Sequence, residues 1–119
     1  MKELKIEKIV NLTPHPLNLM MDGEEIVIPP SGVIARAREE RKLIEVISYA
    51  GREIPVYEVA YGEVENLPEP EAGVIYVVSS LAAQAVRRSQ PHRDDVYVPG
   101  DPVRDSQGRI IGMRGLCKI

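Results

Sequence analysis

The sequence predicts a single α+β domain over residues 1–119, with a mixed, mostly antiparallel sheet of about seven to nine short strands and one helix. Ten prolines and nine glycines occur in the 119 residues, and this content of turn-forming residues favours many short elements over a helical bundle. Phe and Trp are absent, so the core has to be built from Val, Ile, Leu and Ala. The length is typical of one domain with one core.

The N-terminal part of the chain is expected to form a strand and a hairpin. The first strand is predicted over Leu4–Leu12, where apolar residues stand among lysines and glutamates. Two further segments, Leu17–Met20 and Glu25–Ile28, flank an Asp-Gly dipeptide, which is a strong signal for a tight hairpin turn. Another strand is expected over Val33–Arg38, because apolar and polar residues alternate there.

The segment Leu43–Ala50 fits two structures. Its apolar residues have the i, i+3, i+4, i+7 spacing of a helix, whereas three of its residues are β-branched, which favours a strand. Gly51 suits either a helix end or a hairpin turn. We favour the hairpin, in which this segment pairs with a strand over Ile54–Tyr61.

The centre of the prediction is a strand-helix-strand unit. It begins with Val74–Val78, five β-branched or aromatic residues in a row, and a continuous apolar run of this kind is typical of a strand that is buried on both faces. A helix over about 80–89 follows, with one apolar stripe made of Leu81, Ala82, Ala85 and Val86. Ser79 or Ser80 is a favoured N-cap, and Pro91 stops the helix.

The C-terminal part is expected to form strands only. The second strand of the central unit follows the helix and includes Val96. A terminal hairpin is predicted from Val103-Arg104 into Arg109–Met113, with Gly108 at the left-handed position of the turn.

Two loops carry the candidate binding residues. Asn11, Thr13 and His15 follow the first strand, and two prolines beside His15 stiffen this loop. Ser79 and Ser80 stand between a buried strand and a helix N-terminus, the place where α/β proteins often bind an anion. In the simpler reading the serines only cap the helix. The two loops share one sheet edge if the first and central strands are parallel neighbours, which the sequence does not decide.

Our leading hypothesis is a module that binds a small anionic ligand such as a nucleotide, without a cofactor or metal. The ligand-binding residues would be Asn11, Thr13, His15, Ser79, Ser80 and Arg93. Arg93 would join the others only through antiparallel strand pairing or from a second subunit. One alternative is a hydrolase or phosphodiesterase in which His15 is the general acid or base and Asp94 its partner. A second alternative is a structural or accessory oligomer.

Charge and composition narrow the classes of partner. The formal net charge of −3 argues against a dedicated duplex nucleic-acid or anionic-membrane binder. Cys117 is the only cysteine, so no intrachain disulfide and no thiolate-cluster metal site is expected. A cytoplasmic protein is the expectation. Many strands and one short helix leave strand edges to cover, which favours a homo-oligomer.

Several short motifs resemble those of a family of small, mostly uncharacterised proteins from bacteria, archaea and phages. The motifs are Asn-Leu-Thr-Pro-His at 11–15, Ile-Pro-Pro-Ser-Gly at 28–32, Tyr-Gly-Glu-Val at 61–64, Val-Ser-Ser-Leu at 78–81, Arg-Asp-Asp-Val at 93–96, Val-Arg-Asp at 103–105 and Gly-Arg-Ile-Ile-Gly at 108–112. The resemblance spans almost the whole chain and implies a stand-alone domain in a prokaryotic or viral setting. In that setting the module would sense or sequester a signalling nucleotide in defence or counter-defence.

Overall fold

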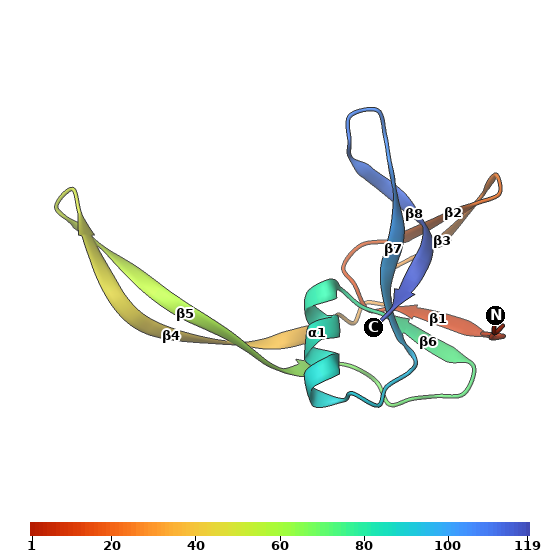
Figure 1. Cartoon of the computed structure of the whole chain (residues 1–119), viewed down its shortest axis with the longest axis horizontal. Helices are drawn as coiled ribbons and strands as arrows, with labels where there is room; N and C mark the ends of the chain where they lie inside the picture. The colour runs from red at the N-terminus through yellow and green to blue at the C-terminus, as the bar shows by residue number, and fades with distance from the viewer.

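The computed structural model describes all residues, 1–119, and contains eight strands and one helix (Figure 1). The strands are β1 (Lys8–Asn11), β2 (Leu17–Met21), β3 (Glu24–Ile28), β4 (Arg36–Tyr49), β5 (Arg52–Glu65), β6 (Val74–Val77), β7 (Val96–Arg104) and β8 (Ile110–Lys118), and the helix α1 is Ser80–Ser89. The α+β class, the number of strands and the single helix are confirmed. The helix lacks the length and apolar character needed to cross a membrane.

Six strands form one mixed, curled sheet in the order β1-β6-β7-β8-β2-β3, and β4 and β5 form a separate hairpin. The strands β1, β6 and β7 are parallel neighbours, and α1 connects β6 to β7. The predicted strand-helix-strand unit is therefore confirmed. The three antiparallel pairs, β2–β3, β4–β5 and β7–β8, have the longest ladders.

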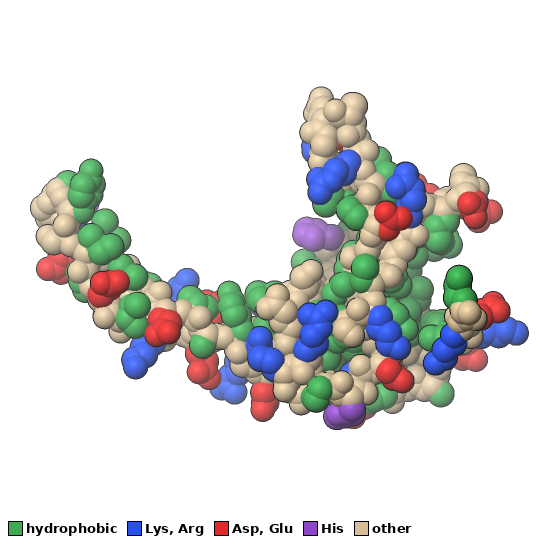
Figure 2. All heavy atoms as spheres, in the orientation of Figure 1, with side chains coloured by type: hydrophobic (Ala, Val, Ile, Leu, Met, Phe, Trp, Pro, Cys, Tyr) green, Lys and Arg blue, Asp and Glu red, His purple; other side chains and the backbone are tan.

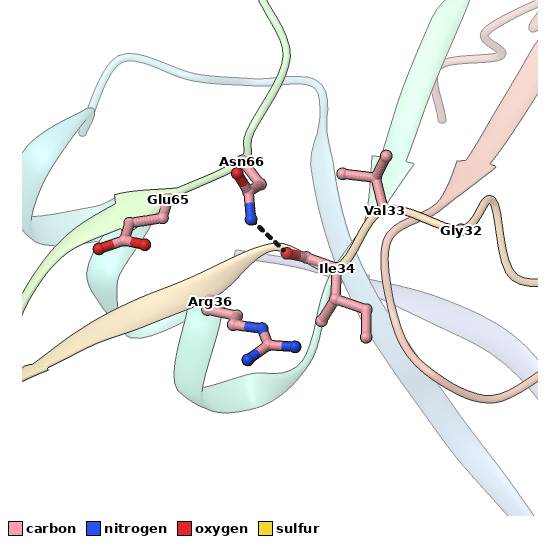
Figure 3. Close-up of a pocket in the computed structure, with 6 residues that line it drawn as sticks. All are labelled: Gly32, Val33, Ile34, Arg36, Glu65 and Asn66. Carbon is pink, nitrogen blue, oxygen red and sulfur yellow. Dashed lines mark hydrogen bonds between the residues drawn. The ribbon is translucent and has the colours of Figure 1, made fainter.

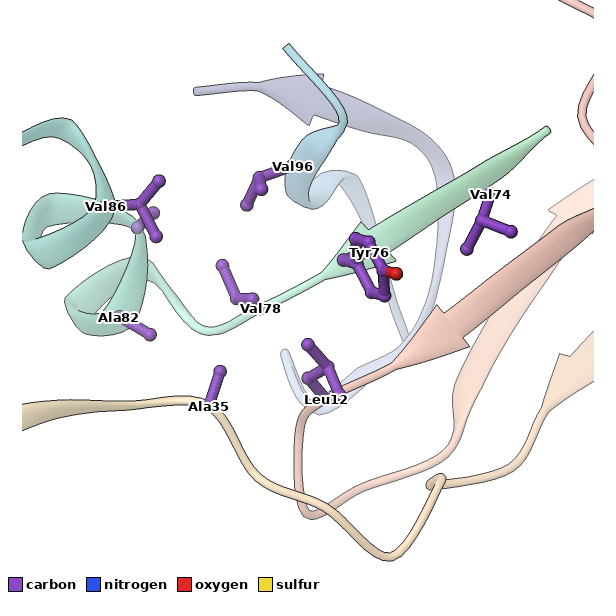
Figure 4. Close-up of a cluster of buried hydrophobic side chains, with 9 residues drawn as sticks. Leu12, Ala35, Val74, Tyr76, Val78, Ala82, Val86 and Val96 are labelled. Atoms are coloured by element: carbon purple, nitrogen blue, oxygen red, sulfur yellow. The ribbon is translucent and has the colours of Figure 1, made fainter. Parts of the chain in front are cut away.

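The main core lies between α1 and one face of the sheet (Figure 4). It contains Leu12, Ala35, Val74, Tyr76, Val78, Ala82, Ala83, Val86 and Val96. The small alanines of α1 allow the helix to pack closely on the strands. One position of the predicted stripe is wrong: Leu81 is exposed, and Ala83 is buried in its place.

A second, smaller core covers the other face of β6. Val77 packs there with Leu17, Leu19 and Met113, because the sheet curls and carries β2 and β8 over this face. Side chains of successive strand residues point to opposite faces, which explains why Val77 and Val78 belong to different clusters. The prediction of a strand buried on both faces is confirmed.

The hairpin of β4 and β5 is the largest difference from the prediction. The segment 43–50 is a strand, as favoured, but it continues without a break from the strand expected at 33–38, so that β4 has 14 residues. Its partner β5 also has 14 residues, and Ala50 and Gly51 form the turn, both with positive φ. The hairpin projects as an arm beyond α1 (Figure 1). We call it the β4–β5 arm.

Two further strand boundaries differ from the prediction. The first strand begins at Lys8 rather than Leu4, because its partner β6 offers only four residues for pairing. The strand β7 runs through Pro99 and Pro102 into the terminal hairpin. Prolines are tolerated there because β7 pairs with β6 only at Val96 and Tyr97, which leaves the rest of that strand edge free. Gly108 has φ 81°, which confirms the left-handed turn position.

Candidate functional site

The candidate site lies where β1 and β6 end. The two strands are parallel, with Asn11 opposite Val77, so the loops that follow them leave the same edge of the sheet. Together with the β7–β8 hairpin these loops enclose a shallow hollow of about 440 Å³. Its lining residues are Thr13, Pro14, His15, Pro16, Leu17, Ser79, Ser80, Pro99, Ile110 and Met113. The structure therefore brings together four of the six predicted binding residues, namely Thr13, His15, Ser79 and Ser80.

Asn11 holds the first loop in shape. Its side chain is 1% exposed, and its amide donates hydrogen bonds to the carbonyl oxygens of His15 (2.8 Å) and Ile28 (3.2 Å). Its Oδ1 accepts hydrogen bonds from the N–H of Thr13 (2.9 Å) and from Thr13 Oγ1 (2.7 Å). An asparagine side chain has two donors and two acceptor positions. All four are used inside the loop, so Asn11 positions the loop and has no group left for a ligand.

Thr13 has a similar role. Its hydroxyl donates to Asn11 Oδ1, lies 3.0 Å from the carbonyl oxygen of His15 and accepts from the N–H of His15 at 3.4 Å. Only the backbone of His15 takes part in this network, and its imidazole is exposed at the rim of the hollow. The loop therefore fixes the backbone of His15 and leaves the imidazole nitrogens available.

The other wall of the hollow is the N-terminus of α1. Ser79 is the N-cap, because its hydroxyl accepts a hydrogen bond from the N–H of Ala82 at 3.2 Å. The capping role expected of one serine is thus confirmed for Ser79. The N–H groups of Ser80 and Leu81 belong to the first turn and have no intrahelical acceptor. These donors and the exposed hydroxyl of Ser80 remain free for a ligand.

Arg93 lies elsewhere. It precedes β7, which is parallel to β6, so it is at the opposite end of the sheet from Ser79. Its guanidinium is buried and donates to both carboxylate oxygens of Asp95 (2.9 and 3.1 Å), to Gln90 Oε1 (2.9 Å) and to the carbonyl of Pro68 (2.9 Å). With these partners Arg93 stabilises the fold around the loop before β6.

Asp94 shares this distant end. It is exposed and stands about five strand residues from the level of Ser79, which corresponds to roughly 15 Å along a strand. Within one chain the structure does not bring His15 and Asp94 together as an acid–base pair.

Tyr76 packs between the core and Arg93. Its ring centre lies 5.9 Å from the guanidinium carbon of Arg93, and its hydroxyl donates to the carbonyl of Glu69 at 3.0 Å. Burial raises the pKa of Tyr76 above 10.0, the carboxylates of Glu71 and Asp95 raise that pKa further, and the charge of Arg93 opposes them. The neutral hydroxyl is therefore the form that the fold stabilises.

A second hollow, of about 450 Å³, lies at the base of the β4–β5 arm (Figure 3). Its walls are Gly32, Val33, Ile34, Arg36, Glu65 and Asn66. The amide of Asn66 donates to the carbonyl of Ile34 at 3.1 Å, while the side chains of Arg36 and Glu65 point in different directions. Sequence analysis missed these residues, because the walls come from two segments that only the arm brings together. One cation and one anion that do not converge make this hollow the weaker candidate.

No group of three or more His, Cys, Asp or Glu side chains is arranged to hold a metal ion. The donors at the first hollow are hydroxyl, imidazole and backbone N–H groups, and none of its lining residues is acidic. Comparison of the chain with family models, with curated proteins and with solved structures gave no match.

Proposed function

We propose that this protein binds a small phosphate-bearing ligand, most simply a nucleotide, in the hollow at the ends of β1 and β6. The observation that carries this proposal is the parallel pairing of β1 and β6, because it places the His15 loop beside the N-terminus of α1. A loop with a histidine, or a helix N-terminus, is common by itself. Here the two lie side by side, so hydrogen-bond donors face one hollow from two sides.

The chemistry of the hollow favours an anion. The free N–H groups of the first helical turn carry the positive end of the helix dipole, and they point toward a region without carboxylates. Ser80 would donate its hydroxyl to a phosphate oxygen, and His15 would donate an imidazole N–H. Apolar side chains complete the wall, namely Leu17, Ile110 and Met113, and such a surface suits the face of a sugar or base.

The proposal is tested by titrating ¹⁵N-labelled protein with inorganic phosphate and with mono- and cyclic nucleotides. We expect the amide signals of Ser80 and Leu81 to shift, since their N–H groups would donate to the phosphate. His15→Ala and Ser80→Ala should each weaken binding about tenfold, which corresponds to the loss of one hydrogen bond to a charged group. Neither side chain supports the fold.

Two matched substitutions serve as controls. His92→Ala removes the other exposed histidine, which follows α1 at the far end of the sheet, and Ser106→Ala removes an exposed serine in the β7–β8 turn. Both should leave the affinity unchanged. Unshifted Ser80 and Leu81 signals with every probe, or equal affinities in all four variants, would refute the site. Consumption of the nucleotide, abolished by His15→Ala, would replace simple binding by the hydrolase alternative.

A further inference from the structure

The β4–β5 arm has an apolar row on one face. Residues that are direct partners in an antiparallel ladder share a face, and the register of the arm places five exposed large apolar residues together. We call Leu43, Val46, Tyr57, Val59 and Tyr61 the apolar row. Each of them is between 40% and 55% exposed. Figure 2 shows hydrophobic side chains along the projecting arm with no other part of the chain over them.

The opposite face of the arm is different near its base. The ladder pairs Lys42 with Glu58 and Glu40 with Ala60 on that face, so charged residues dominate there. The outer half of this second face is also apolar, with Val56, Ile54, Ile47 and Tyr49 on it. Near its base the arm thus has one solvated face and one face that carries the apolar row together with Glu39 and Arg41. Apart from the guanidinium of Arg41, which lies 5.5 Å from the ring centre of Tyr57, no side chain covers that row.

The whole chain is less compact than a typical monomer of its length, which indicates that part of its surface is normally covered by a partner. Its radius of gyration is 18.2 Å, whereas a compact chain of this length has about 13.5 Å. Its accessible surface is 8684 Å², and a compact monomer of 13.2 kDa exposes about 6,400 Å². The excess of roughly 2,300 Å² is larger than the roughly 800 Å² that each partner buries in a standard interface.

A hairpin of this length is not expected to be stable alone. An isolated two-stranded sheet is marginal in water, and only the base of the arm is held by the body, through bonds such as Val64 N–H to Ser89 Oγ at 3.5 Å. The outer edges of both strands are also unpaired. The arm therefore needs a partner surface that is apolar, elongated and matched to its length.

We propose that this partner is a second copy of the same chain, with the apolar rows of two arms packed face to face about a twofold axis. In an antiparallel arrangement centred between Pro55 and Tyr57, the Val46–Pro55 pair of one arm lies opposite the Leu43–Tyr57 pair of the other. In this arrangement β4 lies over β4 and β5 over β5, so Arg41 of one chain faces Ser48 of its partner and lies diagonally across from Glu53, which gives the flanking charges opposite signs. A twofold contact of this kind is self-complementary and closes as a dimer.

The test is the mass in solution, measured by sedimentation velocity over a wide range of protein concentration. The wild-type chain is expected to sediment as a dimer of the 13.2 kDa unit. Val59→Asp places a charge in the apolar row, and because the interface contains the substitution twice, the dimer should dissociate at least about a hundredfold more readily. Its neighbour Ala60 lies on the other face, so Ala60→Asp is the matched control and should leave the dimer intact.

The charge pair gives an independent check on the arrangement. Arg41→Glu alone and Glu53→Arg alone should each weaken the dimer, and the combined variant should restore it. Arg41 also contacts Glu39 at 3.1 Å within its own chain, but that pair is exposed and contributes little. A monomeric wild-type chain at every concentration, or an equal loss in Val59→Asp and Ala60→Asp, would overturn the dimer through the apolar row. A combined variant as weak as the single ones would overturn the antiparallel pairing.

Discussion

Arg93 links the end of α1 to the loop before β6 and to the residue that precedes β7. Its guanidinium is buried and donates four hydrogen bonds, to Asp95, Gln90 and the carbonyl of Pro68, so it is held inside the fold and is not presented to a ligand. Asn11 and Thr13 are similar, because their polar atoms close the loop that carries His15. The sequence pattern indicates that Asn11 and Thr13 come at the end of a strand, as the structure has them, but not which of their polar atoms point inward.

The buried Arg93–Asp95 pair should make a large contribution to stability. Asp95→Ala removes a partner at 2.9 Å and leaves the guanidinium buried without its carboxylate, so we expect a loss of about 3 kcal/mol in the free energy of unfolding. Urea denaturation measures this loss. Asp94→Ala, at an exposed position beside it, should change stability by less than about 0.5 kcal/mol. Equal effects would show that the pair is not a determinant of the fold.

Tyr76 should make stability depend on pH in the alkaline range. Its pKa is raised in the folded state above the unfolded value of 10.0, so the unfolded chain releases the proton first. The contribution of Tyr76 is complete below that pH and is lost as the pH rises toward the native pKa. Tyr76→Phe should lower stability by about 1 kcal/mol at neutral pH, through the lost bond to Glu69, and the gap should narrow above about pH 10.

Chemical denaturation at a series of pH values follows that gap directly. A difference between the wild-type chain and Tyr76→Phe that stays constant up to about pH 11 would contradict a raised pKa for the Tyr76 hydroxyl. The comparison of two variants cancels the titration of groups that they share.

At the scale of single elements, local sequence signals were sufficient for the helix and the tight turns. The helix starts with a cap at Ser79, buries its alanine-rich face and ends before Pro91, as the pattern indicates, except that Ala83 is buried where Leu81 was expected. The turns at Asp22-Gly23 and Gly108 depend on neighbouring residues alone, and they are also as expected. Each of these features depends on residues that are close together in the sequence.

The two serines at the start of the helix should differ in their effect on the free energy of unfolding. Ser79→Ala removes the bond to the N–H of Ala82 and should cost about 1 kcal/mol. Ser80→Ala removes only an exposed hydroxyl and should change the free energy of unfolding by less than about 0.5 kcal/mol. Thermal unfolding followed by circular dichroism at 222 nm reports the helix. A larger loss in Ser80→Ala would contradict the assignment of Ser79 as the cap.

The β4–β5 arm could not be predicted as one element for a physical reason. Burial against a core produces the periodicity from which strands are recognised, and the arm is exposed on both faces. Five charged residues at 38–42 also separate its two apolar parts, so the sequence resembles two short strands with a polar connection. The parallel pairing of β1 and β6 could not be predicted either, because it depends on residues that are far apart in the sequence.

At the scale of the whole molecule, the chain divides into a body and an arm. The extents of 59 × 39 × 28 Å reflect the arm and the projecting hairpins rather than a globular outline. The arm leaves the body at Arg36 and returns at Glu65, and these two residues pair directly. The body therefore receives both ends of the arm at one point.

This geometry predicts that the arm can be removed without loss of the body. Replacing residues 40–60 by Asn-Gly joins the Glu39–Tyr61 pair through a short hairpin turn. We expect the shortened chain to keep its helical signal, to unfold cooperatively and to be monomeric, since both cores lie in the body. Circular dichroism and light scattering measure these properties. Loss of the helical signal would show that the arm is required for folding of the body.

Lys8 and its partner Val74 are far apart in the sequence, and this distance determines the order in which the body and the arm can form during synthesis. The arm needs only contacts between neighbouring segments, and hairpins form within microseconds, although an isolated hairpin is only marginally stable. The body must wait until β6 and β7 have left the ribosome, because β1 has no partner before then. An emerging chain thus exposes its apolar row before its body can form, so in the proposed dimer two chains translated side by side on one messenger would meet first through their arms.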